Sequence, residues 1–409
     1  MDVTGPWIRT AAAAGLLRDG VPLPTVFARI SALAARTGAL NLGQGFPDDA
    51  PPGIVADAAV AAIREGRNQY PPGAGEPTLR EAIAAHQAAW YSLDWDPQNE
   101  VMVSTGATEA LAAALLAFVE PGDEVITLEP FYDQYAALIG LTGAVHRTVP
   151  LSSRTDPASG DLVLEVDEQA LRAAFSPRTR LVLVNTPHNP TGIMLPDPVL
   201  RMIVEEARRH DALIVTDEVY EHLTFGQPHQ PLAALPGARE RTVSISSAGK
   251  TFAVTGWKIG WATAPAQLVR AMTSVKQWLT YSSGAPFQHA VAAGLGMDQA
   301  AFAELAEGLR ARRDLLTTGL REIGFQVAVP AAGYFTVADA APLREPAADD
   351  LAERLPHEAG VAAIPLTAFH RSPSAADGSA SRLRFAFCKS RSTIEQALER
   401  LDAWAAVRR

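Results

Sequence analysis

Short apolar runs alternate with amphipathic segments through the middle of the chain. Runs of strand length and strand composition occur between residues 100 and 265, at 101–104, 124–128, 181–184, 213–216, 242–245 and 259–263. Between them lie helical patterns, such as those at 109–119 and 198–209. This alternation predicts an α/β fold in which helices cover both faces of a mostly parallel sheet.

The pattern changes towards the C-terminus. Residues 302–322 carry leucines at helical spacing among many charges, which predicts a long amphipathic helix with its Leu stripe in a core. Short strand-like runs follow at 325–329, 334–337 and 382–387. Residues 371–381 are rich in Ser, Ala, Asp and Gly, which is typical of a mobile loop. These elements predict a smaller α+β domain.

Length and composition narrow the class of protein. A chain of 409 residues exceeds what one core normally holds, so two domains are expected. The 35 basic and 45 acidic residues give a net charge of −10, which argues against general binding of nucleic acid or anionic membranes. The single cysteine, Cys388, excludes an internal disulfide and suits a reducing cytoplasm. The alanine-rich run at 11–17 is too short to span a bilayer and is interpreted as a loose or helical arm.

One lysine has neighbours that suggest a cofactor site. Lys250 follows the apolar run 242–245 among small hydroxylated residues, and Lys258 lies eight positions further on. A lysine amine can form an imine with an aldehyde, while Ser247 and Lys258 can hold a phosphate dianion. These residue types fit pyridoxal phosphate. Taken alone, however, a lysine after a strand is more often a solvated surface residue.

Two further strand ends supply what such a cofactor needs. Asp217 comes directly after the apolar run 213–216. It should therefore lie at the carboxyl edge of the sheet, where α/β folds bind ligands. An acidic group there could keep the pyridine nitrogen protonated, so that the ring accepts electrons, and Tyr220 could bond the ring oxygen. An isolated Asp in this place is usually a turn or helix cap. The segment Asn-Thr-Pro-His-Asn-Pro-Thr-Gly at 185–192 can likewise be both a turn and a site.

Together these motifs resemble the fold-type I pyridoxal-phosphate aminotransferases of class I/II. The resemblance runs from about residue 20 to the end of the chain and is carried, in the family's order, by residues 41–48, 68–70, 104–110, 129–133, 189–192, 217–220, 246–252 and 382–385. It implies a large domain at 49–295 with a mostly parallel seven-stranded sheet between helices. It also implies a smaller α+β domain at 296–409, which the N-terminal arm at 1–48 joins in part.

The resemblance assigns roles to individual residues. Lys250 would bind the cofactor and move protons, with Asp217 on the ring nitrogen and Tyr220 on the ring oxygen. Tyr132 would stack on the ring, and Asn189 would bond both the ring oxygen and the substrate carboxylate. The family also implies cis peptide bonds at Glu129-Pro130 and Asn189-Pro190.

Two further groups of residues complete the implied site, and no metal is expected in it. The phosphate would be held at a helix N-terminus and by polar side chains, one of them from the neighbouring subunit: Gly106, Ala107, Thr108, Ser247, Lys258 and, from the neighbour, Tyr70. The substrate would contact an arginine clamp, the Asn189 amide and the pocket walls: Arg384, Asn189, Gly45, Phe27 and Ser283.

The implied activity is exchange of an amino group between an L-amino acid and a 2-oxo acid, with 2-oxoglutarate or glutamate as partner, by a cytoplasmic homodimer. The motifs are most similar to N-succinyl-diaminopimelate aminotransferases and to kynurenine, glutamine and methionine aminotransferases. Thr108 and the pair Ser283-Gly284 stand where kynurenine-type members carry bulky groups, which favours N-succinyl-LL-diaminopimelate. The kynurenine, glutamine or methionine specificity, and lyase or cyclase chemistry on the same fold, remain alternatives.

Overall fold

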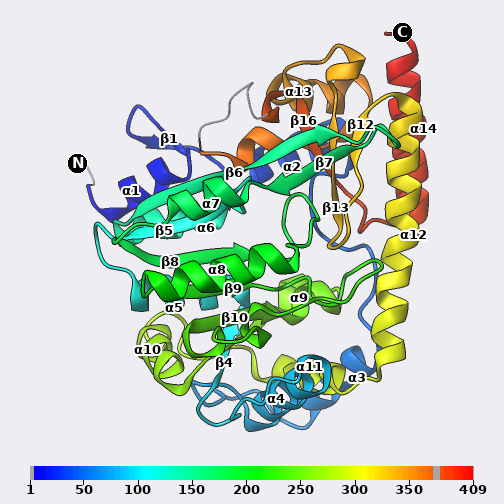
Figure 1. Cartoon of the computed structure of the whole chain (residues 1–409). Coiled ribbons are helices and arrows are strands. Elements are labelled where there is room, and N and C mark those ends of the chain that lie inside the picture. Colours follow the sequence, from blue (N-terminus) through cyan, green and yellow to red (C-terminus); the bar gives the residue numbers. More distant parts are fainter. Residues whose placement is uncertain (1–3, 372–377, 409) are drawn as a thin grey trace.

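An eight-stranded sheet forms the centre of the computed structural model, which describes residues 4–371 and 378–408 (Figure 1). The strand order is β4-β11-β10-β9-β8-β5-β6-β7. The bounds of these strands are β4 (Val101–Thr105), β5 (Glu124–Glu129), β6 (Val145–Thr155), β7 (Leu162–Val166), β8 (Thr179–Asn185), β9 (Leu213–Asp217), β10 (Thr242–Ser247) and β11 (Ile259–Thr263). All six strands predicted in this region are present.

The directions of the strands agree with the predicted mostly parallel sheet, and β7 is an additional strand. The neighbours from β10 through β6 pair in parallel, and β11 is antiparallel to both β10 and β4. The α/β class and the mostly parallel sheet are therefore confirmed. The sheet has eight strands rather than seven because β6 extends for 11 residues and its distal half pairs with β7 in an antiparallel hairpin. This hairpin lacks the continuous apolar run that revealed the other strands, since half or more of its residues face solvent.

Helices cover both faces of this sheet, as β8 illustrates. Its Leu181 and Leu183 belong to an apolar cluster with α5 and α10, whereas Val182 and Val184 belong to a second cluster with α8. A strand buried on both faces carries apolar residues without alternation. The helices are α1 (Pro6–Ala13), α2 (Val26–Thr37), α3 (Gly53–Arg64), α4 (Pro77–Tyr91), α5 (Gly106–Phe118), α6 (Asp133–Thr142), α7 (Glu168–Ala174), α8 (Asp197–Arg209), α9 (Ala248–Thr251), α10 (Ala266–Lys276), α11 (Ala285–Leu295), α12 (Gln299–Ile323), α13 (Ala348–Glu358) and α14 (Arg391–Ala406).

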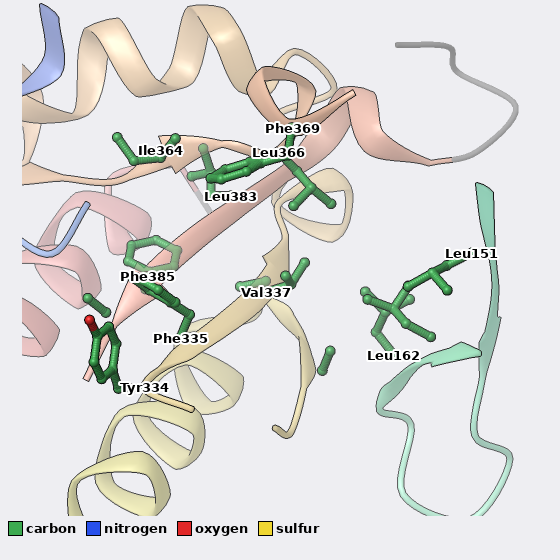
Figure 2. Packing of buried hydrophobic residues seen from close by; sticks show 14 of the residues in the cluster. Leu151, Leu162, Tyr334, Phe335, Val337, Ile364, Leu366, Phe369, Leu383 and Phe385 are labelled. Carbon is green, nitrogen blue, oxygen red and sulfur yellow. The ribbon is translucent and has the colours of Figure 1, made fainter. Parts of the chain in front are cut away.

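A smaller antiparallel sheet lies beside the large one. Its strands are, in order, β12 (Gln326–Ala328), β13 (Phe335–Asp339), β16 (Arg382–Ala386) and β15 (Ile364–Pro365). Figure 2 shows its core side chains, among them Val337, Leu383 and Phe385, with Leu151 and Leu162 of the β6–β7 hairpin nearby. Two short ladders complete the strands of the described residues: β1 (Leu17–Arg18) with β2 (Val21–Pro22), and β3 (Leu40–Asn41) with β14 (Val361–Ala362).

The pairing of β3 with β14 joins an N-terminal segment to the C-terminal part of the chain. This contact supports our proposal that the chain divides into 1–48, 49–295 and 296–409, the first segment contributing to the third. The predicted helix at 302–322 is present as α12, which runs along both parts (Figure 1). Its Phe302 packs with Phe252 in the cluster under the large sheet, whereas Leu316 and Leu320 pack in the core of the small one.

The N-terminal arm contains α1, which packs against α6. Of the loop predicted at 371–381, residues 372–377 lie outside the described residues, and Ser379–Ser381 form a short 3-10 turn. Among the helices that the structure describes, none is long and apolar enough to cross a bilayer.

Candidate active site

A cavity of about 470 Å³ lies at the carboxyl edge of the large sheet. Asp217 ends β9, Ser247 ends β10 with Lys250 just beyond it, and Gly106 follows β4. These three strands point in the same direction, so their ends meet at one edge. The small sheet closes the other side of the cavity. It contributes Arg384 of β16, Phe335, which begins β13, and Tyr334 just before it. The cavity therefore lies between the two sheets.

The structure brings nearly all the sequence-predicted site residues to this cavity. Those that line it are Phe27, Gly45, Gly106, Ala107, Thr108, Tyr132, Asn189, Asp217, Tyr220, Ser247, Lys250, Lys258 and Arg384. Tyr70 and Ser283 do not line it within this chain. Tyr70 is 85% exposed and packs edge-on against Tyr281, with ring centroids 5.9 Å apart. Ser283 is buried, and its hydroxyl donates to the backbone carbonyl of Lys258 at 3.3 Å.

A tyrosine that the sequence analysis missed holds the carboxylate of Asp217. Tyr135 donates its hydroxyl proton to Oδ2 at 2.5 Å, and the backbone N–H of Val219 donates to Oδ1 at 3.4 Å. Burial raises the pKa of Asp217, while the Tyr135 hydrogen bond and the charge of Lys250 act in the opposite direction. A buried carboxylate fixed in this way is suited to accept a hydrogen bond from a protonated ring nitrogen.

Lys250 projects beside aromatic walls. Its Nζ lies 5.6 Å from the ring centroid of Tyr334 and 5.9 Å from that of Tyr220. Tyr334 is held in place because its hydroxyl donates to the backbone carbonyl of Gly45 at 2.9 Å. The amine therefore lies between the two sheets, with Tyr220 and Asp217 on the large-sheet side.

The start of α5 forms a cradle for an anion. The cap residue, Thr105, makes no side-chain hydrogen bond to the helix, so the amides of the first turn remain available to a ligand. Nζ of Lys258 donates to the Thr108 hydroxyl at 3.2 Å, and burial, followed by the nearby charge of Lys250, lowers the pKa of Lys258. A Cβ on Gly260 would lie 2.5 Å from the Gly106 carbonyl carbon, so glycine is needed where β11 passes the cradle. Amides, a hydroxyl and an ammonium group thus converge, as a phosphate dianion requires.

Arg384 is a buried cation whose bonds reach only neutral oxygens. It is 2% exposed; its two terminal nitrogens donate to Asn189 Oδ1 at 3.1 Å and to the Gly43 carbonyl at 2.7 Å. Nε has no partner among the described residues. The Phe335 ring centroid lies 3.7 Å from its Cζ, and burial lowers the pKa of Arg384 to about 10, so it stays charged at neutral pH. A buried charge of this kind is stabilised by an anionic ligand such as a carboxylate.

Two polar residues of the cavity were not given roles from the sequence. Asn185, which ends β8, donates to the Asp217 carbonyl at 2.8 Å and accepts from the Asn189 N–H at 2.7 Å, so it links the two functional turns. The same strand-end rule that found Asp217 could have found it. Gln134 donates to the Thr108 carbonyl at 2.9 Å, while its buried Oε1 has no partner among the described residues. No sequence signal distinguishes this glutamine.

The cis peptide bonds expected from the family resemblance are present. Both Glu129-Pro130 and Asn189-Pro190 are cis, so this prediction is confirmed. A third cis bond, at Thr186-Pro187, was not predicted.

The fold and the cavity together define a pyridoxal-phosphate-dependent aminotransferase of fold-type I, an enzyme that acts on amino acids and 2-oxo acids. The family model for aminotransferase class I and II matches residues 37–401, and the chain belongs to this family.

Comparison with individual proteins shows which aminotransferases this chain is similar to. The chain is 48% identical over 388 residues to a probable N-succinyldiaminopimelate aminotransferase of Mycobacterium tuberculosis, which covers 93% of this chain and 96% of the relative. The solved structure of the Mycobacterium tuberculosis N-succinyldiaminopimelate aminotransferase matches with a TM-score of 0.88 over 93% of this chain and 97% of that one, again at 48% identity. A kynurenine–oxoglutarate transaminase 3 of Mus musculus is 36% identical, covering 93% of this chain and 88% of the relative.

Proposed function

We propose that this aminotransferase takes the amino group of N-succinyl-LL-diaminopimelate, with 2-oxoglutarate and glutamate as the exchange pair. The observation that carries the choice of substrate is the 48% identity, over nearly the whole of both chains, to the mycobacterial relative of that name. Relatives of other specificity lie at lower identity, 36% for the murine kynurenine enzyme.

The residues of the cavity fit pyridoxal phosphate, which supplies an aldehyde for the amino group and a ring that takes up electrons. In our proposal Lys250 would bind the cofactor through its aldehyde, and the same amine, when free, would move a proton to and from the substrate. Asp217 would favour the protonated form of the ring nitrogen, and Tyr220 and Asn189 would bond the ring oxygen. Tyr132 would pack on the ring face. The α5 cradle and the end of β10 would hold the phosphate through Gly106, Ala107, Thr108, Ser247 and Lys258.

The substrate carboxylate belongs on Arg384 in this proposal. Its Nε, which has no partner in the part of the chain that the structure describes, and its neighbour Asn189 offer donors to a carboxylate, and the fork of a guanidinium can bond both oxygens. Phe27 and Phe335 cover the guanidinium at 5.3 and 3.7 Å, which excludes water from the ion pair.

Arg384→Lys is expected to lower kcat/KM for the amino acid roughly 30-fold or more, mainly by raising KM. A lysine is a point charge that cannot bond two oxygens in parallel, and loss of one partner of a buried charged pair costs about 2–5 kcal/mol. Steady-state kinetics with varied amino acid measure the effect. Arg382→Lys, on the same strand but paired with Asp339, is the matched control. An unchanged KM in Arg384→Lys would remove Arg384 from substrate binding.

The wall beyond the α-carbon has polar and small groups that suit a long acylated chain. Thr108 leaves space where kynurenine-type members are bulky, and Gln134, whose buried Oε1 has no hydrogen-bond partner among the described residues, lines the same cavity. The amide N–H of the succinylated side chain could donate to this oxygen, whereas the thioether side chain of methionine has no donor. Burial of an unpaired acceptor disfavours substrates that cannot do so.

We expect kcat/KM for N-succinyl-LL-diaminopimelate to exceed that for kynurenine by about 10–200-fold, because a flat ring fills the space poorly. The measurement follows glutamate formed from 2-oxoglutarate with each donor. Gln134→Met, similar in length but without the acceptor, should reduce the ratio. If kcat/KM for kynurenine or methionine were tenfold higher than for N-succinyl-LL-diaminopimelate, the proposed substrate would be wrong. The assignment as an aminotransferase would not be affected. Release of pyruvate and ammonia without an oxo acid would instead indicate a lyase.

We further propose a cytoplasmic homodimer in which Tyr70 reaches the phosphate of the neighbouring subunit. Tyr70, Trp278 and Tyr281 are 85%, 82% and 50% exposed, and aromatic side chains gathered on a surface favour a protein interface. Thr280, between the last two, bonds the Glu109 carboxylate at 2.5 Å and the Thr105 hydroxyl at 3.1 Å. The patch therefore adjoins the anion cradle, where a second copy could complete the site.

A further inference from the structure

A buried polar cluster lies behind the turn that carries Asp217 and Tyr220, outside the active-site cavity. His86 of α4, Glu221 and His222 each offer a ligand atom, and these atoms all lie within 4.8 Å of one another. The three residues are 3%, 3% and 8% exposed. Two of them come from the turn after β9 and the third from a helix 135 or more positions earlier in the chain. Tertiary packing alone brings them together.

The hydrogen bonds of the cluster leave some of its buried polar atoms without partners among the described residues. Nε2 of His86 and Nε2 of His222 are 2.7 Å apart, so one ring must donate to the other. Within the described residues, Nδ1 of His86 and Oε2 of Glu221 make no well-aligned hydrogen bond, and the Tyr91 hydroxyl, which also lacks an aligned partner, lies beside the Glu221 carboxylate. The other carboxylate oxygen of Glu221 accepts from the hydroxyl of Ser246, which orients the carboxylate. Unpaired buried polar atoms are uncommon in folded proteins and indicate a missing ligand.

The surroundings suit a transition-metal ion rather than an alkaline-earth ion. Aromatic rings enclose the histidines, since the ring centroids of Trp90 and Phe302 lie 4.6 and 4.4 Å from that of His222. Imidazole nitrogens favour Zn²⁺, Ni²⁺ and Cu²⁺, whereas Mg²⁺ and Ca²⁺ require oxygen ligands.

A neighbouring cavity gives a metal ion access to the cluster and leaves room for a fourth ligand. Glu221 and His222 line a pocket of about 780 Å³, together with His229 and Tyr91. An ion could enter from it, and a water could complete four-fold coordination. Two nitrogens that share a tetrahedral zinc ion are about 3.3 Å apart, given Zn–N bonds of about 2.0–2.1 Å. The 2.7 Å contact must therefore open slightly when the ion binds.

We propose that His86, Glu221 and His222 form a structural site for one divalent transition-metal ion of the zinc class. The ion would fasten α4 to the turn that holds Asp217 and Tyr220. Through Glu221 it would also fasten Ser246, near the start of the Lys250 segment. Coordination by both Nε2 atoms requires the proton on the donating Nε2 to move to Nδ1 of the same ring, which leaves the charge of that ring unchanged, and no electron is transferred.

The test uses the tag-free, full-length holoenzyme, freed of excess cofactor and amino acids, treated with a chelator and titrated with ZnCl2 or MgCl2. We expect one zinc per chain by elemental analysis after gel filtration, a rise in melting temperature with zinc and no change with magnesium. His222→Gln and Glu221→Gln should each weaken zinc binding by about tenfold or more. His210→Gln, a partly exposed histidine at the end of α8, should bind zinc as the wild type does.

Absence of stoichiometric zinc in the wild type, equal binding by His222→Gln, or equal stabilisation by magnesium would each overturn the site. If the variants do not fold, X-ray absorption of the zinc-loaded wild type decides: two imidazole nitrogens at about 2.0–2.1 Å support it, and a shell without histidine overturns it. These readouts are independent of activity, so they hold whichever amino acid proves to be the substrate.

Discussion

Lys250→Ala is expected to abolish transamination, lowering kcat by about 10⁴-fold or more, the upper end of what a positioned proton-transfer group contributes. In the proposed mechanism this one amine both binds the cofactor and carries the α-proton, so no neighbour can replace it. Lys258, the nearest cation of the cradle, already donates to Thr108 and has its own role with the phosphate. Single-turnover and steady-state assays with the cofactor added in excess measure the loss.

The cofactor linkage can be tested separately from the rate. Borohydride reduction of the yellow wild-type enzyme should place the pyridoxyl label on Lys250 by peptide mass analysis. Lys250→Arg, which keeps the charge, should be unlabelled and inactive. Lys276→Arg is the matched control, because Lys276 is buried and donates to the Gly73 and Tyr281 carbonyls away from the cavity. A label on Lys258, Lys276 or Lys389 would overturn the site assignment.

Asp217→Asn is expected to leave the fold intact and to lower kcat by about 10²–10³-fold, the usual cost of removing one preorganised electrostatic group. A neutral amide cannot keep the ring nitrogen protonated, so the ring accepts electrons poorly. The amide is similar in size and can still accept the hydrogen bond from Tyr135. Melting temperature and kcat with the preferred amino donor should therefore diverge, the first nearly unchanged and the second strongly reduced.

Tyr135→Phe provides the graded comparison. It removes the 2.5 Å hydrogen bond to Asp217 Oδ2 but leaves the carboxylate in place, so a loss of about tenfold is expected, in line with a hydrogen bond to a charged group. Asp217→Glu should recover part of the rate lost in Asp217→Asn because the charge returns. Near-normal turnover in Asp217→Asn would exclude Asp217 from the mechanism.

Much of the site could be predicted because it lies at strand ends. The runs before Asp217 and Asn185 are almost entirely apolar, and the run before Ser247 is rich in β-branched residues, so all three are recognisable as buried strands from the sequence. Parallel pairing then brings their polar last residues to one edge without any knowledge of side-chain packing. The β6–β7 hairpin escaped the same reasoning, since β6 alternates between core and solvent and ends in the polar run Ser152–Thr155.

Contacts between segments far apart in the chain were outside the reach of the sequence. The aromatic cover of Arg384 depends on Phe335 of the adjacent strand β13 and on Phe369 beyond β15, and its hydrogen bonds depend on Gly43, 341 positions away. The zinc-class site proposed here is a similar case. Its histidines are 136 positions apart, and no spacing in the sequence resembles a metal motif, so no metal was expected.

The sequence by itself determined the fold class, the positions along the chain of the strands that carry chemistry and the residue types at the ends of these strands. These follow from local periodicity and from the chemistry of single side chains, both of which are properties of short segments. Only the tertiary structure decided that Tyr135 holds Asp217, that Gln134 packs against the first turn of α5 and that His86 meets His222. Such pairs depend on how helices dock against the sheet, and docking is set by side-chain packing summed over the whole core rather than by any one segment.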